Sequence, residues 1–274
     1  MMGGHHAATG AAVWLAVTTR LHVDLSAVTS HTPLGPVTFD VGLGLLHVSP
    51  LGVVAGALVT AGAALVPDAD HRNATIAHSL PPVSKALCIG MEELAGGHRH
   101  GTHSLLGLAL FTATAWVAGL WRVPVPGLGP VGVGAGILSI LLVSFAAKAL
   151  KLVPDRLRIT PWIVGILVGG FIALAAPQEE GWFPQAMFLG VAAHIVGDAL
   201  TVGGVNLLWP LSLRPPKAFR KIPVLASVWS QGGYMAVPLL GKAGSFREWL
   251  LLVPVSLYTV WALGTTVYQT LAPR

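Results

Sequence analysis

Long apolar runs constrain the fold of this chain more than any other feature of its sequence. A helix needs about 20 consecutive apolar residues to cross the hydrocarbon layer of a bilayer. Six stretches approach this length: 43–66, 105–121, 131–150, 161–176, 183–200 and 249–271. Two weaker candidates are 7–23, and 222–240, which is interrupted by Ser, Gln, Gly and Pro and could instead be re-entrant or interfacial. The pattern predicts an all-α, polytopic transmembrane bundle of about 6–7 spans with short loops.

Composition supports a membrane protein and excludes several other classes. Hydrophobic residues make up 54% of the 274-residue chain and charged residues only 10%, whereas an ordinary soluble domain has about 25% charged residues. These values exclude intrinsic disorder, a fibrous chain and a water-soluble globule, and they predict one integral-membrane domain over residues 1–274. The single cysteine, Cys88, excludes an intrachain disulfide and a cysteine-based zinc site.

Basic residues orient the predicted bundle in the membrane. Two basic clusters lie between predicted spans, one at Lys148, Lys151, Arg156 and Arg158 and one at Arg214, Lys217, Arg220 and Lys221. The turn between these clusters is acidic, with Glu179 and Glu180. The positive-inside rule places both basic clusters in the cytoplasm and the acidic turn outside. Threading the other spans from there brings residue 6, segments 68–71 and 98–104, and residue 198 to the cytoplasmic face of the inner membrane.

The sequence contains 11 histidines, as many as Asp and Glu together. Segment 67–71, Pro-Asp-Ala-Asp-His, directly follows an apolar run. If the segment is extended, one of Asp68 and Asp70 could bind a metal while the other orients a ligand or binds a second metal. The alternative is a solvated turn that ends a helix.

A second polar segment, 97–104, holds His98, His100 and His103 before another apolar run. Such a density of imidazoles can supply two or three ligands to divalent metals. Thr102 or Ser104 could cap the N-terminus of the following helix. The alternative is an interfacial loop whose histidines contact lipid headgroups.

A third motif, His194 and Asp198, lies within an apolar stretch at a spacing that puts both side chains on one helix face. Ionisable groups inside a span usually face a cavity and indicate function, although a self-satisfied core pair is the alternative. His6 is a further candidate, and His5 beside it could take its place. The remaining histidines without such partners are interpreted as interfacial or packing residues: His22, His31, His47 and His78.

Taken in order, these motifs resemble the YdjM-like family of predicted membrane-bound, metal-dependent hydrolases, described as LexA-regulated inner-membrane proteins. The family's motifs correspond here to His6 with Gly10, 67–71, 98–104 and 194–210, and weakly to Gly244, Ser245 and Glu248. The motif-bearing part is 1–212, followed by a C-terminal segment, 213–274, with a basic loop and the last span. The family usually has Gly and an aromatic residue between Arg99 and Thr102, where this chain has His100 and Gly101. This departure alters the lining of the expected pocket and adds a possible ligand.

The resemblance implies a hydrolase with a composite metal centre at the cytoplasmic face. A more distant similarity to zinc-dependent phospholipase C and single-strand nucleases implies phosphoester substrates and two or three zinc ions. The metal ligands expected on this basis are His6, Asp68, Asp70, His98, His103, His194 and Asp198. The expected catalytic residues are Asp70, His71, which is a ligand or supports one, and Arg99, which would pair with a phosphate.

The expected chemistry is hydrolysis by water that a divalent metal activates. Imidazole ligands favour zinc, and the carboxylates keep manganese and magnesium as candidates. A site at the membrane interface suits membrane lipids as partners, with a phospholipid or lipid phosphate as the substrate. No nucleic acid is expected, because the basic loops lack interleaved aromatic residues. Two alternatives stay open: a transporter of protons or metal ions, and a non-catalytic membrane protein with a structural metal.

Overall fold

The structure is a computed structural model, and it describes residues 1–33, 35–153, 159–175 and 181–272. Several residues that the sequence analysis used lie outside the described residues: Arg156, Arg158, Ala176, Glu179 and Glu180.

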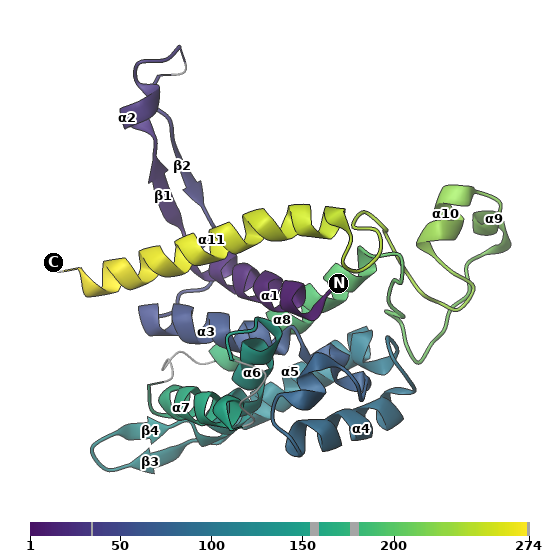
Figure 1. The fold of residues 1–274 in the computed structure, drawn as a ribbon, viewed down its shortest axis with the longest axis horizontal. Coiled ribbons are helices and arrows are strands. Elements are labelled where there is room, and N and C mark those ends of the chain that lie inside the picture. Colours follow the sequence, from purple (N-terminus) through teal and green to yellow (C-terminus); the bar gives the residue numbers. More distant parts are fainter. Residues whose placement is uncertain (34, 154–158, 176–180, 273–274) are drawn as a thin grey trace.

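The described part of the chain is mostly helical, as predicted. Eight helices of more than ten residues form its body in Figure 1: α1 (Gly3–Thr18), α3 (Pro50–Ala63), α4 (Val83–Ala95), α5 (Leu105–Leu120), α6 (Val133–Ala149), α7 (Thr160–Ala175), α8 (Trp182–Ala199) and α11 (Phe246–Leu271). The shorter helices are α2 (Ser26–Thr29), α9 (Lys217–Arg220) and α10 (Pro223–Val228), with 3-10 turns η1 (Val66–Asp70), η2 (Thr75–His78) and η3 (Gly101–His103).

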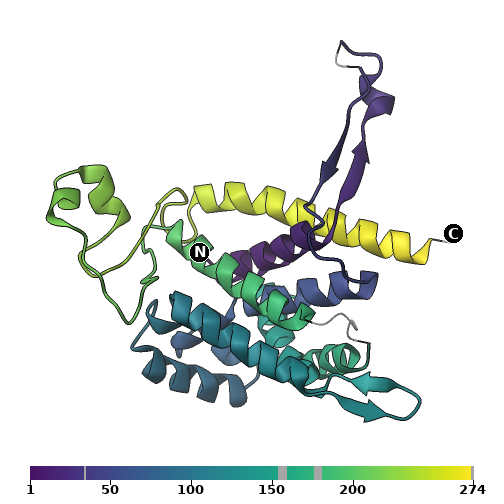
Figure 2. The same ribbon diagram turned by 180° about the vertical axis from the view of Figure 1, so that it is seen from behind.

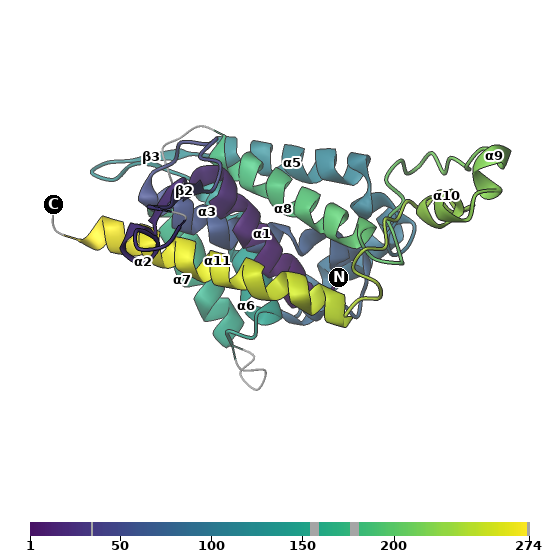
Figure 3. The ribbon, with the colours of Figure 1, turned by 90° about the horizontal axis from the view of Figure 1, so that it is seen from above.

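Two of these elements are long and apolar enough to cross a membrane on length and composition alone. They are the continuous stretch Pro50–Asp70, which joins α3 to η1, and α11. Apolar helices of shorter length are Leu105–Leu120, Val133–Ala149 and Thr160–Leu174. In the most apolar window of Pro50–Asp70, 78% is buried, against 11% for α11. The first stretch therefore belongs to the core, whereas α11 lies along the outside, across α1 (Figure 3).

The prediction of short loops is wrong between α1 and α3. There the chain forms an antiparallel hairpin of β1 (Leu21–Asp24) and β2 (Thr38–Val41), which stands out from the helices in Figure 2. The described residues between these strands are mainly exposed, including the apolar side chains of Leu25 and Val28, so this connection runs over the surface and not through the core. A second, smaller hairpin of β3 (Val123–Val125) and β4 (Gly129–Val131) joins α5 to α6. Segment 222–240 is not a span, because it forms only α10 and then turns at Gly232 and Gly233.

Glycines let three helices meet at the carbonyl of Thr60 in α3. A Cβ at Gly10 of α1 would lie 2.7 Å from the Thr60 carbonyl oxygen, and a Cβ at Gly190 of α8 would lie 2.6 Å from it. Side chains at these positions would force the helices apart, because real Cβ atoms do not come so close. Close packing by small residues is typical of helix interfaces in membranes. It brings the start of α1 and the end of α8 together at one end of α3.

Candidate metal centre

The predicted site residues converge at that end of the bundle from four separate parts of the sequence. His6 lies in the first turns of α1, and Asp68 and Asp70 lie in η1, directly after α3. Ser104 caps α5 by accepting a hydrogen bond from the Gly107 amide at 3.1 Å, which places the preceding η3 and His103 beside the helix start. His194 and Asp198 occupy the last turns of α8 and share one face, as their spacing predicts.

The side chains form three overlapping groups whose candidate ligand atoms lie within 4.8 Å of one another. The groups are His6, His194 and Asp198; Asp68, His103 and His194; and Asp70, His98 and His103. His103 and His194 each belong to two groups, so these residues link the whole cluster. All seven residues predicted as metal ligands are in a group, whereas His71 and Arg99 are in none of those formed by the described residues.

The two shared histidines face each other through nitrogens that carry lone pairs. His194 donates from Nδ1 to the Ala64 carbonyl at 2.7 Å, since a carbonyl only accepts. His103 Nδ1 lies 3.1 Å from Asp70 Oδ2, which likewise accepts. With both Nδ1 protons placed in this way, the two Nε2 atoms have lone pairs, yet they lie only 3.0 Å apart and are fully buried. A cation shared by these nitrogens, either a metal ion or an additional proton, is needed to offset their repulsion.

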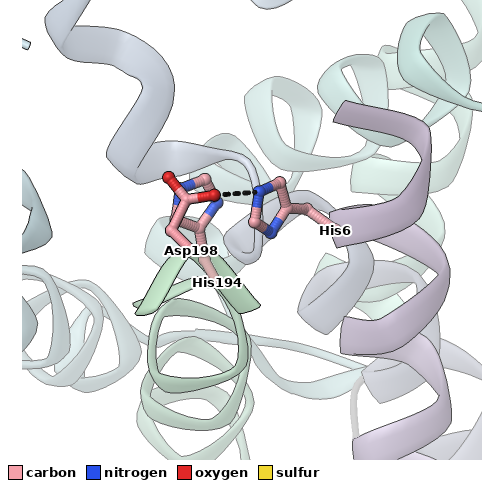
Figure 4. A group of neighbouring side chains, drawn as sticks. All are labelled: His6, His194 and Asp198. Carbon is pink, nitrogen blue, oxygen red and sulfur yellow. Dashed lines mark hydrogen bonds and ion pairs between the residues drawn. The ribbon is translucent and has the colours of Figure 1, made fainter. Parts of the chain in front are cut away.

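His6 adds another buried nitrogen to the same place. Its ring stacks on that of His194, with centroids 3.7 Å apart, and its Nε2 lies 3.1 Å from Asp198 Oδ1 (Figure 4). His6 Nδ1 is buried and has no hydrogen-bond partner among the described residues. A buried polar atom without a partner is costly in a folded protein. The donor set of imidazoles and carboxylates around it is one that zinc accepts, so the residues present fit a divalent metal.

Asp70 and Asp68 have different surroundings. Asp70 is fully buried and is held by His98 Nδ1 at 2.7 Å and by the Thr102 hydroxyl at 2.5 Å. Asp68 is 24% exposed and lies 3.7 Å from His194 Nε2. The segment is a 3-10 helix rather than extended, but the two carboxylates still face different histidine groups. The hydrogen bond that His98 donates to Asp70 raises the pKa of His98, because the carboxylate favours the imidazolium form.

Arg99 connects two of the buried carboxylates. Its guanidinium Nη2 lies 2.9 Å from Asp198 Oδ2, and its backbone amide donates to Asp70 Oδ2 at 2.9 Å. The backbone takes a left-handed conformation at Arg99, with φ of 64°. A Cβ at Gly203 would lie 2.0 Å from Arg99 Nη1, so only glycine leaves room for the guanidinium there. In this arrangement Arg99 already has an anionic partner, Asp198.

His71 and His100 lie beside the cluster rather than in it. The exposed His71 ring accepts a hydrogen bond from the Asn73 amide at 3.1 Å and contacts the edge of His98. His100, the departure from the family pattern, lies 3.2 Å from the Tyr234 hydroxyl through its Nε2. Sequence analysis did not find Tyr234, because it is a lone tyrosine 134 residues along the chain from its partner.

The structure separates the roles of His5 and His6. His6 faces Asp198, whereas His5 contacts Glu248 of α11 through its Nδ1. Glu248 is fully buried and also accepts hydrogen bonds from the backbone amides of Met2 and Gly244, each at 2.7 Å. The Ser-x-x-Glu pattern at 245–248 is typical of a helix N-terminus. This pattern does not predict that Glu248 also contacts the start of α1, the helix that carries His6.

We expect Glu248→Ala to lower the metal content of the purified protein several-fold. The substitution leaves the amides of Met2 and Gly244 and the His5 ring without their acceptor, so the first turn of α1 that carries His6 loses its attachment to α11. Metal per protein should be measured by elemental analysis. Glu248→Gln keeps one acceptor oxygen and should have a smaller effect, and exposed Glu93→Ala is the control. Full metal content in Glu248→Ala would show that this contact does not position the centre.

Comparison with known proteins agrees with the resemblance seen in the motifs. A family profile described as YdjM inner membrane protein matches residues 1–269. A search of curated proteins and a search of solved structures each give no significant match. The profile spans nearly the whole chain, including all three histidine and aspartate groups and most of α11. The chain therefore belongs to the YdjM inner membrane protein family.

Proposed function

We propose that this protein is a membrane-embedded, metal-dependent hydrolase that cleaves a phosphoester of a lipid or another amphiphilic substrate. The observation that carries the proposal is the pair of buried Nε2 atoms of His103 and His194, 3.0 Å apart. Two carboxylates, those of Asp68 and Asp198, approach these nitrogens to within 4 Å. Burying so many ionisable groups together costs desolvation free energy, so such a cluster favours a bound cation or a functional role.

The proposed metal is zinc, with manganese and magnesium as the other candidates, and two or three ions are compatible with the three groups of side chains. The proposed ligands are His6, Asp68, Asp70, His98, His103, His194 and Asp198. When bound, a divalent metal supplies Lewis acidity towards a phosphoryl oxygen and lowers the pKa of water.

The remaining contacts orient these groups. Ala64 and Asp70 fix the ring orientation and tautomer of His194 and His103, so that each presents its Nε2 to the centre. Arg99 has further N–H groups besides those directed to Asp198 and the Gly204 carbonyl. Arginine binds phosphate through several such groups at once, so Arg99 is proposed to hold the phosphate of the substrate.

The surroundings of the centre support an amphiphilic substrate. A groove of about 510 Å³ runs along α5 and α8 and is lined by apolar side chains, including Leu105, Leu108, Trp116 and Phe188. Leu105, which lines this groove, follows His103 by two residues along the chain. A hydrocarbon chain in this groove would bring an attached phosphate towards Arg99 and the histidines.

In the proposed membrane arrangement, the centre faces the cytoplasm and α1, α3, α5, α6, α7, α8 and α11 span the inner membrane. A Cβ at Gly4 would lie 3.0 Å from the Ala149 carbonyl oxygen. The end of α6, which carries Lys148 and is followed by Lys151, therefore adjoins the start of α1 and the centre. This common location, together with the positive-inside rule, supports the cytoplasmic assignment.

The function is tested with the detergent-purified protein, by measuring bound metal and the hydrolysis of phosphatidic acid and phosphatidylcholine in mixed micelles. We expect chelation to abolish hydrolysis and added zinc to restore it. Asp68→Ala should lower both metal content and hydrolysis, because it removes one of the proposed metal ligands. Asp68 is chosen because it is the most accessible of the three carboxylates in the groups. A protein that binds metal but hydrolyses neither lipid would contradict the proposed activity and favour a structural metal. A metal-free protein, or full metal in Asp68→Ala, would contradict the site itself.

A further inference from the structure

A basic segment with no acidic residues extends from the end of the bundle that carries the centre. Residues 199–247 contain no Asp or Glu, but they contain six basic residues: Arg214, Lys217, Arg220, Lys221, Lys242 and Arg247. We call residues 211–230, which include α9 and α10, the basic arm. Figures 1 and 3 show α9 and α10 standing apart from the long helices. None of the proposed catalytic or metal-binding residues lies in the basic arm.

The basic arm exposes large apolar side chains among its cations. Leu211 is 65% exposed, Leu213 49% and Ile222 50%. The side chains of Lys217 and Lys221 are also exposed. A surface that mixes exposed leucine and isoleucine with lysine and arginine, and has no acidic residues, is typical of segments that bind the interface of an anionic membrane.

The base of the arm is attached to the metal centre. Val205 and Met235 exchange backbone hydrogen bonds of 3.0 and 2.9 Å, which close the segment into a loop. The Leu105 amide at the start of α5 donates to the Leu207 carbonyl at 3.0 Å. Helix α5 has 16 residues, or about 24 Å at 1.5 Å per residue, which is shorter than the hydrocarbon layer of about 30 Å. In the membrane arrangement proposed above α5 crosses the membrane, so its start, Leu105, and the arm attached there lie towards the headgroups on the side of the metal centre.

We propose that the basic arm binds anionic phospholipid headgroups at the membrane face that carries the metal centre. The proposal rests on the membrane arrangement given above but not on the hydrolase activity. Positive charge in a segment without acidic residues supplies the attraction, and the exposed apolar side chains enter the interface. Nucleic acid fits less well, because Trp229 and Phe219 pack against each other at 6.2 Å and Trp229 donates to the Leu213 carbonyl. Both rings therefore already have partners within the arm, whereas proteins that bind single strands use open aromatic faces on which bases stack.

The test places an environment-sensitive fluorophore on the arm of the full-length protein. Ala218→Cys supplies an exposed thiol, whereas the native Cys88 is buried and its pKa is raised to about 11 by that burial, so it stays unlabelled at neutral pH. The labelled protein is reconstituted in nanodiscs of phosphatidylcholine alone or mixed with phosphatidylglycerol. We expect a blue shift of the emission in the mixed discs that high salt reverses, because salt screens exposed charges.

Matched charge variants decide the outcome. A fourfold substitution by Gln in the arm, at Arg214, Lys217, Arg220 and Lys221, should abolish the shift. The matched fourfold substitution outside the arm, at Arg20, Arg72, Lys85 and Arg122, should leave the shift unchanged. The arm variant should also keep its metal content in detergent, which separates this result from any failure of the proposed metal site. Equal emission in both kinds of disc, or an undiminished shift in the arm variant, would overturn the proposal. A shift produced only by added RNA or an acidic polypeptide would also overturn it.

Discussion

His103→Ala should remove at least about nine-tenths of the metal bound to the purified protein, since even residues that merely support ligands affect metal affinity 10–100-fold. His103 belongs to two of the three ligand groups, and its Nε2 faces that of His194 at 3.0 Å. Its loss therefore removes a donor from both groups at once. Elemental analysis of the detergent-purified protein measures the effect. His194→Ala should give a similar loss, because His194 is also shared by two groups.

Controls separate loss of a ligand from loss of the fold. His31 and His78 are exposed and belong to no ligand group among the described residues, so His31→Ala and His78→Ala should keep their metal. His103→Gln retains a polar group near Asp70 and should fold even if the alanine variant aggregates, which size-exclusion chromatography would show. If the histidines share a proton instead of a metal ion, no metal will be found in the parent protein. Full metal content in both His103 variants would refute the assignment.

Gly190→Leu should destabilise the protein by about 1–3 kcal/mol or more, the range expected when a side chain is forced into a packed core. A Cβ at this position would lie 2.6 Å from both the Ala63 Cβ and the Thr60 carbonyl oxygen. Helix α8 must then move away from α3. The same movement would break the bond from His194 to the Ala64 carbonyl, so metal content should fall along with stability. Thermal unfolding in detergent and elemental analysis measure the two effects.

Gly170 in α7 is the matched control for this substitution. It is also a helical glycine, but a Cβ there meets no other atom within 4 Å among the described residues. Gly170→Leu should therefore leave both the unfolding temperature and the metal content close to those of the parent. If Gly190→Leu were as stable as the parent protein, the contact between α8 and α3 would not depend on Gly190. If both lost stability equally, the effect would come from leucine in a membrane helix and not from this interface.

The motifs near one another in sequence were predictable because they depend on local geometry. Helical periodicity places His194 and Asp198 on one face of α8, and the structure has them there. Ser104, one of two capping candidates, is the residue that caps α5. Four polar elements were also expected at one membrane face, because alternating helices return their ends to the same side. Topology alone brings these elements to one face, but it does not determine which of their side chains contact one another.

Pairing of individual side chains was not predictable. Sequence could not distinguish His5 from His6, since adjacent helical residues point about 100° apart and either could face the centre. The same limit applies to Asp68 and Asp70, whose surroundings depend on η1 being a 3-10 helix rather than extended. The long hairpin between α1 and α3 was also missed, because each of its strands has only four residues, too few for a clear alternating pattern.

By itself, the sequence determined that the chain is a mostly helical membrane-family protein with histidines and aspartates gathered near helix ends, because hydropathy and spacing act over short distances. Only the tertiary structure decided which of these groups touch. The contact between α1 and α8 over α3 depends on missing side chains at Gly10 and Gly190, and the attachment of His5 to Glu248 joins residues 243 positions apart. Such contacts arise from the packing of whole helices, so they become visible only when all the helices are in place.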